Sequence, residues 1–398
     1  MATTLASVAV EKRERPTAAT PRALTTRYLD FWLLGGASLC LWAAMYLLQG
    51  FRSQSWAIAH HFNNLAAISA TLALVVNYPH FMASYMLAYG QGGRFVLRYW
   101  YQLIAVPLTL IALMTLGFFL YGDAIHGRQI LTAAHGFVGA LGLSIIGQQP
   151  TGKELMGLLV NLMYFTVGWH YSKQVYGCMM VSASYDGYDL TPQQRTILRW
   201  SLYSIWAASY THANLGGELR DFQGIPYLGL GLPAATYVLA MVVFAAGFIA
   251  SLVLVVLRNF ERNRRRPSAN FLVPYVAFAA WWLPPLVQTD FFLLLVPLFH
   301  SLQYLPFVYK VERARLAEES PGTARHRGTL IVLGLVAAGF LAFELIPNTA
   351  DATLGTFPLM HAWFFFVCAH LFINIHHYFI DNVLWRFRDP LVRQYLLA

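Results

Sequence analysis

The sequence predicts an all-α fold: a polytopic integral membrane bundle of about ten transmembrane helices, with one further re-entrant or interfacial helix. Of its 398 residues, 58% are hydrophobic and only 11% are charged, which is too few charges to solvate a soluble protein of this size. About ten apolar runs are each long enough to cross a bilayer core of about 30 Å. The basic residues gather where these runs end, as the positive-inside rule describes.

The apolar runs define the expected membrane helices. They cover approximately 29–49, 61–90, 98–120, 157–183, 197–216, 227–257, 270–287, 290–310, 329–346 and 358–385. A further apolar segment lies within 121–153, but counting it as a span would place every later basic cluster on the opposite side of the membrane. We therefore expect this segment to form the re-entrant or interfacial helix on the outer face.

The distribution of charge sets the expected domains and location. Residues 1–27 carry five basic side chains and no apolar core of the signal-peptide type, so we expect a disordered cytoplasmic tail there and a single transmembrane domain over 28–398. The net charge of +9 is explained by basic helix ends rather than by nucleic-acid binding. Both termini are expected in the cytoplasm, and the membrane is expected to be a bacterial inner membrane. Cys40, Cys178 and Cys368 lie inside apolar runs without the spacing of a zinc or disulfide site.

Histidines inside the apolar runs are the main functional signal, because ionisable side chains are costly in hydrocarbon and usually belong to a site or a pathway. His300 and His376 each precede a basic helix end by about ten residues, which corresponds to roughly 15 Å along a helix. His80 and His170 fall at a comparable depth in two other runs. We therefore expect four imidazoles from four helices to meet in one layer.

Helical spacing identifies which side chains share a face. In the last run, His370, Asn374, His377 and Asp381 lie within a narrow arc, whereas His376 points about 100° or more away. The choice between His376 and His377 stays open at this point. The candidate metal ligands are His80, His170, His300 and His377 or His376, with His361 and His370 as candidate additional ligands.

Neutral imidazoles with a nearby carboxylate suit a non-haem iron, copper or zinc centre. Haem is less well supported, since only the last run has histidines spaced as axial ligands of two haems. Asp381 is expected to orient a ligand imidazole. Tyr304 is a candidate ligand, proton donor or radical relay, and Lys173, one turn from His170, is a candidate substrate contact or a side chain that snorkels to the interface.

Four short motifs resemble those of the bacterial β-carotene-cleaving membrane dioxygenases of the Brp/Blh type. Pro79-His80 resembles the early Pro-His helix of that family, and His170 its middle-helix histidine. The stretch from His300-Ser301 to Phe307-Val308-Tyr309-Lys310 resembles its third motif, and the stretch from His376 to Ile380-Asp381 its last one. Tyr304 stands where the family has the second histidine of the third motif. The resemblance implies a non-haem Fe(II) centre that activates O2 against a lipid-soluble polyene or isoprenoid.

The sequence thus predicts a membrane-embedded, His-ligated metal oxygenase or oxidoreductase that uses O2, and an electron donor, on a hydrophobic small molecule such as a carotenoid, isoprenoid or lipid. Two alternatives stay open. One is a proton- or metal-coupled transporter in which the histidines, Lys173 and Glu344 form a relay. The other is an accessory subunit of a membrane complex.

Overall fold

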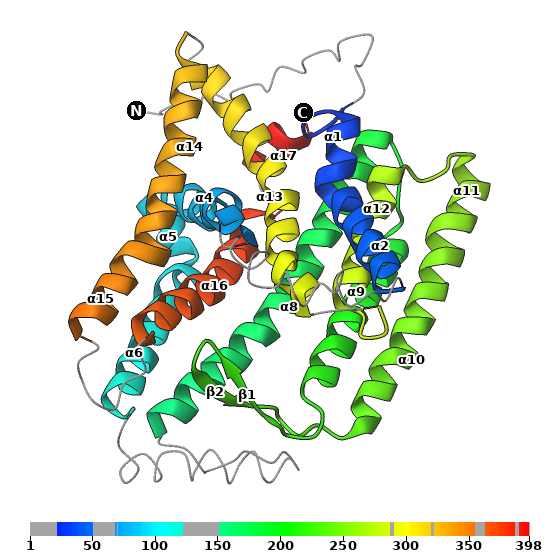
Figure 1. The fold of residues 1–398 in the computed structure, drawn as a ribbon. Coiled ribbons are helices and arrows are strands. Elements are labelled where there is room, and N and C mark those ends of the chain that lie inside the picture. Colours follow the sequence, from blue (N-terminus) through cyan, green and yellow to red (C-terminus); the bar gives the residue numbers. More distant parts are fainter. Residues whose placement is uncertain are drawn as a thin grey trace, which may run out of the picture.

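The computed structural model describes residues 22–50, 68–69, 71–121, 151–286, 290–319, 322–354, 363–386 and 390–397. These ranges are mostly helical (Figure 1), as the all-α prediction requires. One antiparallel ribbon, which the sequence did not predict, joins β1 (Leu219–Phe222) and β2 (Ile225–Leu228). The expected re-entrant helix and most of the expected tail lie outside the described residues.

Within the described ranges, five helical segments are long and apolar enough to span a membrane: Arg27–Leu47, Tyr101–Phe119, Ala234–Glu261, Ala324–Leu354 and Phe364–Leu384. They differ in how much of their most apolar stretch is buried inside the protein. The share is 11% in Ala324–Leu354 and 17% in Ala234–Glu261, but 56% in Phe364–Leu384. Ala324–Leu354 and Ala234–Glu261 therefore leave most of their surface uncovered by the rest of the protein, where lipid can contact it. Phe364–Leu384 is central.

This differs from the ten spans expected from sequence. Three of the predicted runs form helices with many polar side chains, α8 (Thr151–Asp186), α9 (Pro192–Ala213) and α13 (Asp290–Glu319), and these do not qualify by composition. The run 270–287 forms α12 (Ala269–Trp282), whose 14 residues are too few to span; it ends just before Pro284 and Pro285. The run 61–90 is described only in part.

The spanning segments are built from several helical elements. Arg27–Leu47 contains α1 (Arg27–Phe31), a π-helical turn (Trp32–Gly36) and most of α2 (Ala37–Gly50). Other π-helical stretches, at Ala73–Asn77, Tyr101–Ala105, Ser251–Leu257 and Leu341–Leu345, continue directly into neighbouring α-helices. The remaining elements are α4 (Tyr78–Tyr89), α5 (Gly93–Arg98), α6 (Val106–Phe119), α10 (Ala234–Ala250), α11 (Arg258–Asn263), α14 (Ala324–Phe340), α15 (Ile346–Leu354), α16 (Phe364–Leu384) and α17 (Pro390–Leu397).

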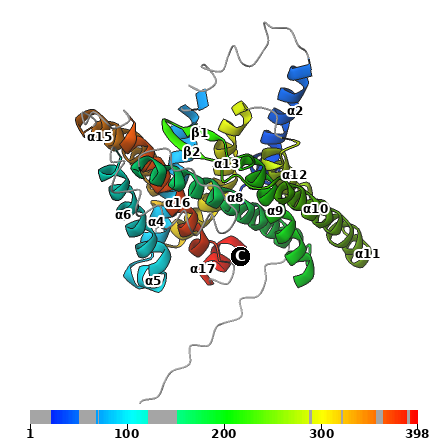
Figure 2. The same ribbon diagram turned by 90° about the horizontal axis from the view of Figure 1, so that it is seen from below.

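Helix α8 is the central element. Its 36 residues extend over about 54 Å, and it contacts α6, α9, α12, α16 and β2. Figures 1 and 2 show α14–α15 and α10–α11 at opposite edges, with α8, α13 and α16 between them. The largest buried apolar cluster lies where α8, α9, α12 and α13 meet, around Val175, Leu202, Phe278 and Trp281.

Two glycines let helices approach closely beside the centre. A Cβ on Gly168 of α8 would lie 2.1 Å from the Trp206 ring of α9, and one on Gly339 of α14 would lie 2.6 Å from Cβ of Tyr78. Because no larger residue fits at either contact, each glycine fixes how near its helix lies to its neighbour. The second contact holds the start of α4 in place, where His80 is located.

Candidate metal centre

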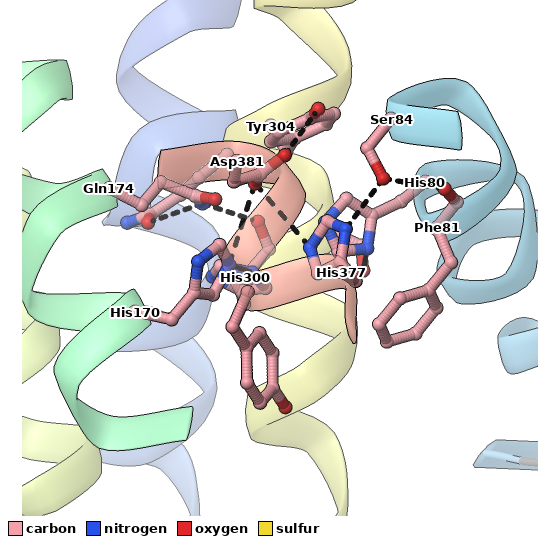
Figure 3. A network of polar contacts seen from close by, with 12 residues as sticks. His80, Phe81, Ser84, His170, Gln174, His300, Tyr304, His377 and Asp381 are labelled. Carbon is pink, nitrogen blue, oxygen red and sulfur yellow. Dashed lines mark hydrogen bonds and ion pairs between the residues drawn. The ribbon is translucent and has the colours of Figure 1, made fainter. Parts of the chain in front are cut away.

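Four buried histidines from four helices form one group, which we call the four-His group: His80 of α4, His170 of α8, His300 of α13 and His377 of α16 (Figure 3). One potential ligand nitrogen from each lies within 4.8 Å of the others. No ring is more than 4% exposed. The convergence of imidazoles expected from depth and spacing is therefore present.

Aromatic side chains hold the imidazole rings of the four-His group. Tyr171 stacks on His300 with ring centroids 3.7 Å apart and planes 10° apart. Tyr378 stacks on His170 at 4.7 Å, and the Phe81 ring meets His377 edge-on at 4.8 Å. Such contacts restrict ring rotation, so the group is arranged by packing before any ligand binds.

Two serines determine where the protons of two imidazoles lie. Ser84 Oγ donates its only proton to the Phe81 carbonyl at 2.7 Å, so its contact of 2.7 Å with His377 Nδ1 must be accepted from that nitrogen. Ser301 Oγ likewise donates to the Pro297 carbonyl and lies 3.1 Å from His80 Nδ1. Both imidazoles therefore carry their proton on Nδ1 and leave a lone pair on Nε2.

Neither of those Nε2 atoms has a hydrogen-bond partner, and the same holds for Nδ1 of His300 among the described residues. Among the described residues, Nε2 of His80 and Nε2 of His377 are buried and accept no hydrogen bond, although buried polar atoms are normally satisfied. The third and fourth imidazoles, His170 and His300, meet through their own Nε2 atoms at 3.0 Å. A hydrogen bond between these two atoms requires a proton on one of them; once that proton is released, the four nitrogens could serve as the donor set of a metal site.

The spacing is close to that of a single ion's ligands. Imidazole nitrogens about 2.1 Å from an ion lie about 3.0 to 4.2 Å from one another, depending on the coordination angle. The separation of 3.0 Å between His170 and His300 meets this, whereas the widest separation in the group, 4.8 Å, has to shorten by at least about 0.6 Å. The four-His group could therefore hold a metal ion after a small contraction; the donor set does not define which metal.

A carboxylate faces the same space. Asp381 Oδ2 lies 3.4 Å from Nε2 of His377 and 3.6 Å from Nε2 of His170, and Oδ1 accepts a hydrogen bond of 3.0 Å from the Tyr304 hydroxyl. Asp381 thus stands on the lone-pair side of the imidazoles. The outer Nδ1 positions, where a ligand-orienting group would be expected, are occupied by Ser84 and Ser301 instead.

The structure brings together only some of the candidate ligands. His376 turns away, with Nδ1 2.9 Å from the Tyr85 hydroxyl, and His377 is the one that joins the group. His370 bonds through Nδ1 to the Phe366 carbonyl and lies against Phe343. His212 and His326 are exposed; His60, His61, His126, His135 and His361 lie outside the described residues.

A cavity of about 550 Å³ adjoins the four-His group. Its inner end is lined by His170, Tyr304 and Asp381, and its walls include Phe307, Tyr378 and Trp385. Three cationic side chains also line it: Lys173, Arg199 and Arg386. A volume of this size is in the range of small-molecule sites.

Neither Ser84 nor Ser301 has a role in the prediction from sequence, where Ser301 appears only as part of the third motif. Each serine bonds a histidine of another helix, so spacing within one helix could not reveal the pairing. Arg199 was missed because nothing in α9 marks it, and only the contact between α9 and α8 places it at the cavity.

No protein-family model, curated protein or solved structure matches the chain.

Proposed function

We propose that the protein is a membrane-embedded metalloenzyme: a His-ligated non-haem iron oxygenase or oxidoreductase that acts on a lipid-soluble substrate such as a carotenoid, isoprenoid or lipid. The observation that carries this proposal is the four-His group, with four buried ligand nitrogens within 4.8 Å and Asp381 beside them. The resemblance of its motifs to the Brp/Blh-type dioxygenases favours iron over copper or zinc.

The chain's own residues account for the requirements of such a site. Neutral imidazoles bind a cation without adding negative charge to a site enclosed by apolar helices. Ser84 and Ser301 keep the ligand lone pairs inward, and Tyr304 holds a proton at its hydroxyl against Asp381. When bound, iron supplies redox chemistry with O2 that protein side chains cannot provide.

The cavity gives a substrate access to this centre. Its inner end is shared with the group through His170, and its aromatic walls suit an apolar molecule.

The four closely placed imidazoles also disfavour haem as the cofactor, because the porphyrin's own nitrogens already supply four ligands to its iron.

We place the protein in a bacterial inner membrane with both termini in the cytoplasm. Two contacts support the common side. Lys310 Nζ donates to the Ala23 carbonyl near the start of the described chain, and the Tyr185 hydroxyl donates to the Leu396 carbonyl near its end. Lys310 also lies 4.4 Å from the Tyr185 ring, so both ends meet at one basic edge of the bundle, as a cytoplasmic side requires.

Metal analysis of the detergent-purified protein tests the proposal. We expect stoichiometric iron in the wild type, its loss in His80→Ala and in His300→Ala, and its retention in His212→Ala, an exposed control on α9. Each variant is compared by gel filtration to verify the fold. Folded wild-type protein that takes up no iron, copper or zinc would overturn the proposal and favour the transporter or accessory-subunit alternatives.

A further inference from the structure

The cavity beside the four-His group contains an excess of positive charge. Lys173, Arg199 and Arg386 line it together with one carboxylate, Asp381, and within the described part of the chain none of the three cations pairs with a carboxylate within 4.0 Å. Because Asp381 lies at the inner end beside the imidazoles and is one carboxylate against three cations, an anion bound between the cations lowers their mutual repulsion.

Neutral groups orient these cations instead. Lys173 Nζ donates to the side-chain carbonyl of Asn382 and lies 4.0 Å from the Trp169 ring centroid. Arg386 Nε donates to the Asn382 backbone carbonyl at 3.0 Å, and Arg199 lies 5.1 Å from the Tyr176 ring centroid. Hydrogen bonds and ring contacts of this kind fix a side chain but leave its charge available.

Their positions define a direction along the cavity. Lys173 is half-buried and follows His170 by three residues, about 4.5 Å along α8. Arg386 lies two residues beyond the end of α16 at Leu384, which is itself about 10.5 Å along the helix from His377. Arg199 and Arg386 are exposed. The cavity therefore runs from the metal-binding nitrogens, past a half-buried ammonium, to a mouth with two guanidinium groups.

We propose that the cavity binds an amphiphile with an anionic head, a carboxylate or a phosphate monoester, held by Lys173, Arg199 and Arg386. Its apolar part lies along Phe307 and Trp385 and reaches the four-His group. This inference rests on the proposed function in taking the cavity as the substrate site, and it narrows the substrate from any lipid-soluble molecule to an anionic one.

Basic residues at a membrane edge attract anionic lipids without any defined site. Arg195 separates the two cases, because it is exposed on α9 one turn before Arg199 and does not line the cavity. A surface effect depends on Arg195 as much as on Arg199, whereas a built site depends only on the residues inside it.

The experiment measures equilibrium binding of radiolabelled C16 probes to the full-length protein in a non-ionic detergent. The probes are hexadecanoate, hexadecyl phosphate and the neutral hexadecanol, and the two anions distinguish a carboxylate from a phosphate head. We expect saturable binding of at least one anion, about tenfold tighter than that of hexadecanol. Lys173→Met is expected to weaken it about tenfold, and Arg199→Gln or Arg386→Gln about threefold, because these two side chains are exposed.

Controls keep structural damage apart from loss of charge. Lys173→Arg should retain binding, and Arg195→Gln should leave it unchanged. Equal binding of hexadecanol, or an equal loss in Arg195→Gln and Arg199→Gln, would overturn the inference. Anion binding is measured on chelator-treated protein, and metal content is measured separately. A protein that takes up no metal but still binds the anion refutes only the proposed function. A protein that takes up metal but does not bind the anion refutes only this inference.

Discussion

Replacing Ser84 by alanine tests whether proton placement in the four-His group controls metal binding. Ser84 is fully buried, and its hydroxyl is the acceptor for His377 Nδ1–H at 2.7 Å. In Ser84→Ala that N–H loses its acceptor. Without metal, His377 can move the proton to Nε2, where Asp381 Oδ2 lies 3.4 Å away. With metal bound it cannot, because Nε2 must supply a lone pair.

The penalty therefore falls mainly on the metal-bound state and appears as lost affinity. A buried donor without an acceptor costs about 1–3 kcal/mol, and outer hydrogen bonds to metal-binding imidazoles contribute about 10- to 100-fold in affinity. Tenfold corresponds to about 1.4 kcal/mol, so the two arguments agree. We expect Ser84→Ala to weaken metal binding about 10- to 100-fold.

The assay is an equilibrium competition for Fe(II) between the purified protein and a chromophoric chelator, with metal content as a second readout. Ser204→Ala is a matched control, because Ser204 Oγ also donates to a carbonyl three residues earlier at 2.7 Å and is buried, but contacts no histidine. A folded Ser84→Ala protein with wild-type affinity, or an equal loss in Ser204→Ala, would refute the proton-placement argument.

Three further outcomes are expected. Chelation of the metal should lower the thermal unfolding midpoint, and re-addition of the metal should restore it. A metal at a free concentration of about 1,000 times its Kd stabilises the folded protein by about 4 kcal/mol; an unchanged midpoint contradicts a bound ion. Gly168→Ala should destabilise by about 1–3 kcal/mol because its Cβ meets Trp206, whereas Gly177→Ala, with no atom within 4 Å of its Cβ, should be neutral or stabilising in the same melt. Asp351→Ala should cost about 1 kcal/mol, because its carboxylate accepts the N–H groups of Phe365 and Phe366 at the start of α16; a wild-type midpoint would show that these bonds do not stabilise the helix.

The sequence predicted the site better than it predicted the membrane topology. Counting residues from the helix ends placed His80, His170 and His300 at one depth, and helical spacing placed His377 and Asp381 on one face. Both predictions were possible because a rigid helix fixes the rise and the rotation per residue. The sequence left the choice between His376 and His377 open: helical spacing put His377 on the face of Asp381, since residues one apart face about 100° from each other, whereas the motif resemblance pointed to His376. The structure brings His377 into the group. The contacts of Ser84, Ser301 and Arg199 could not be predicted, because they depend on how neighbouring helices are rotated and how closely they approach.

The error in the number of spans has a related physical cause. Helices α8 and α13 were counted as spans in the sequence, but they carry imidazoles together with Lys173, Gln174, Gln303 and Lys310, and neither is apolar enough to qualify as a spanning helix in the structure. Such helices are tolerated in a membrane protein when other helices separate them from lipid, and the segments Ala234–Glu261 and Ala324–Leu354, with little of their surface buried, lie at the edges of the bundle. Hydropathy therefore identifies the lipid-facing helices most clearly and helices such as α8 and α13 less clearly, because the polar residues that form a buried site also lower the hydropathy of the helices that carry them. Helix α16 carries His377 and Asp381 and still qualifies as a span, since the rest of its sequence is mostly apolar.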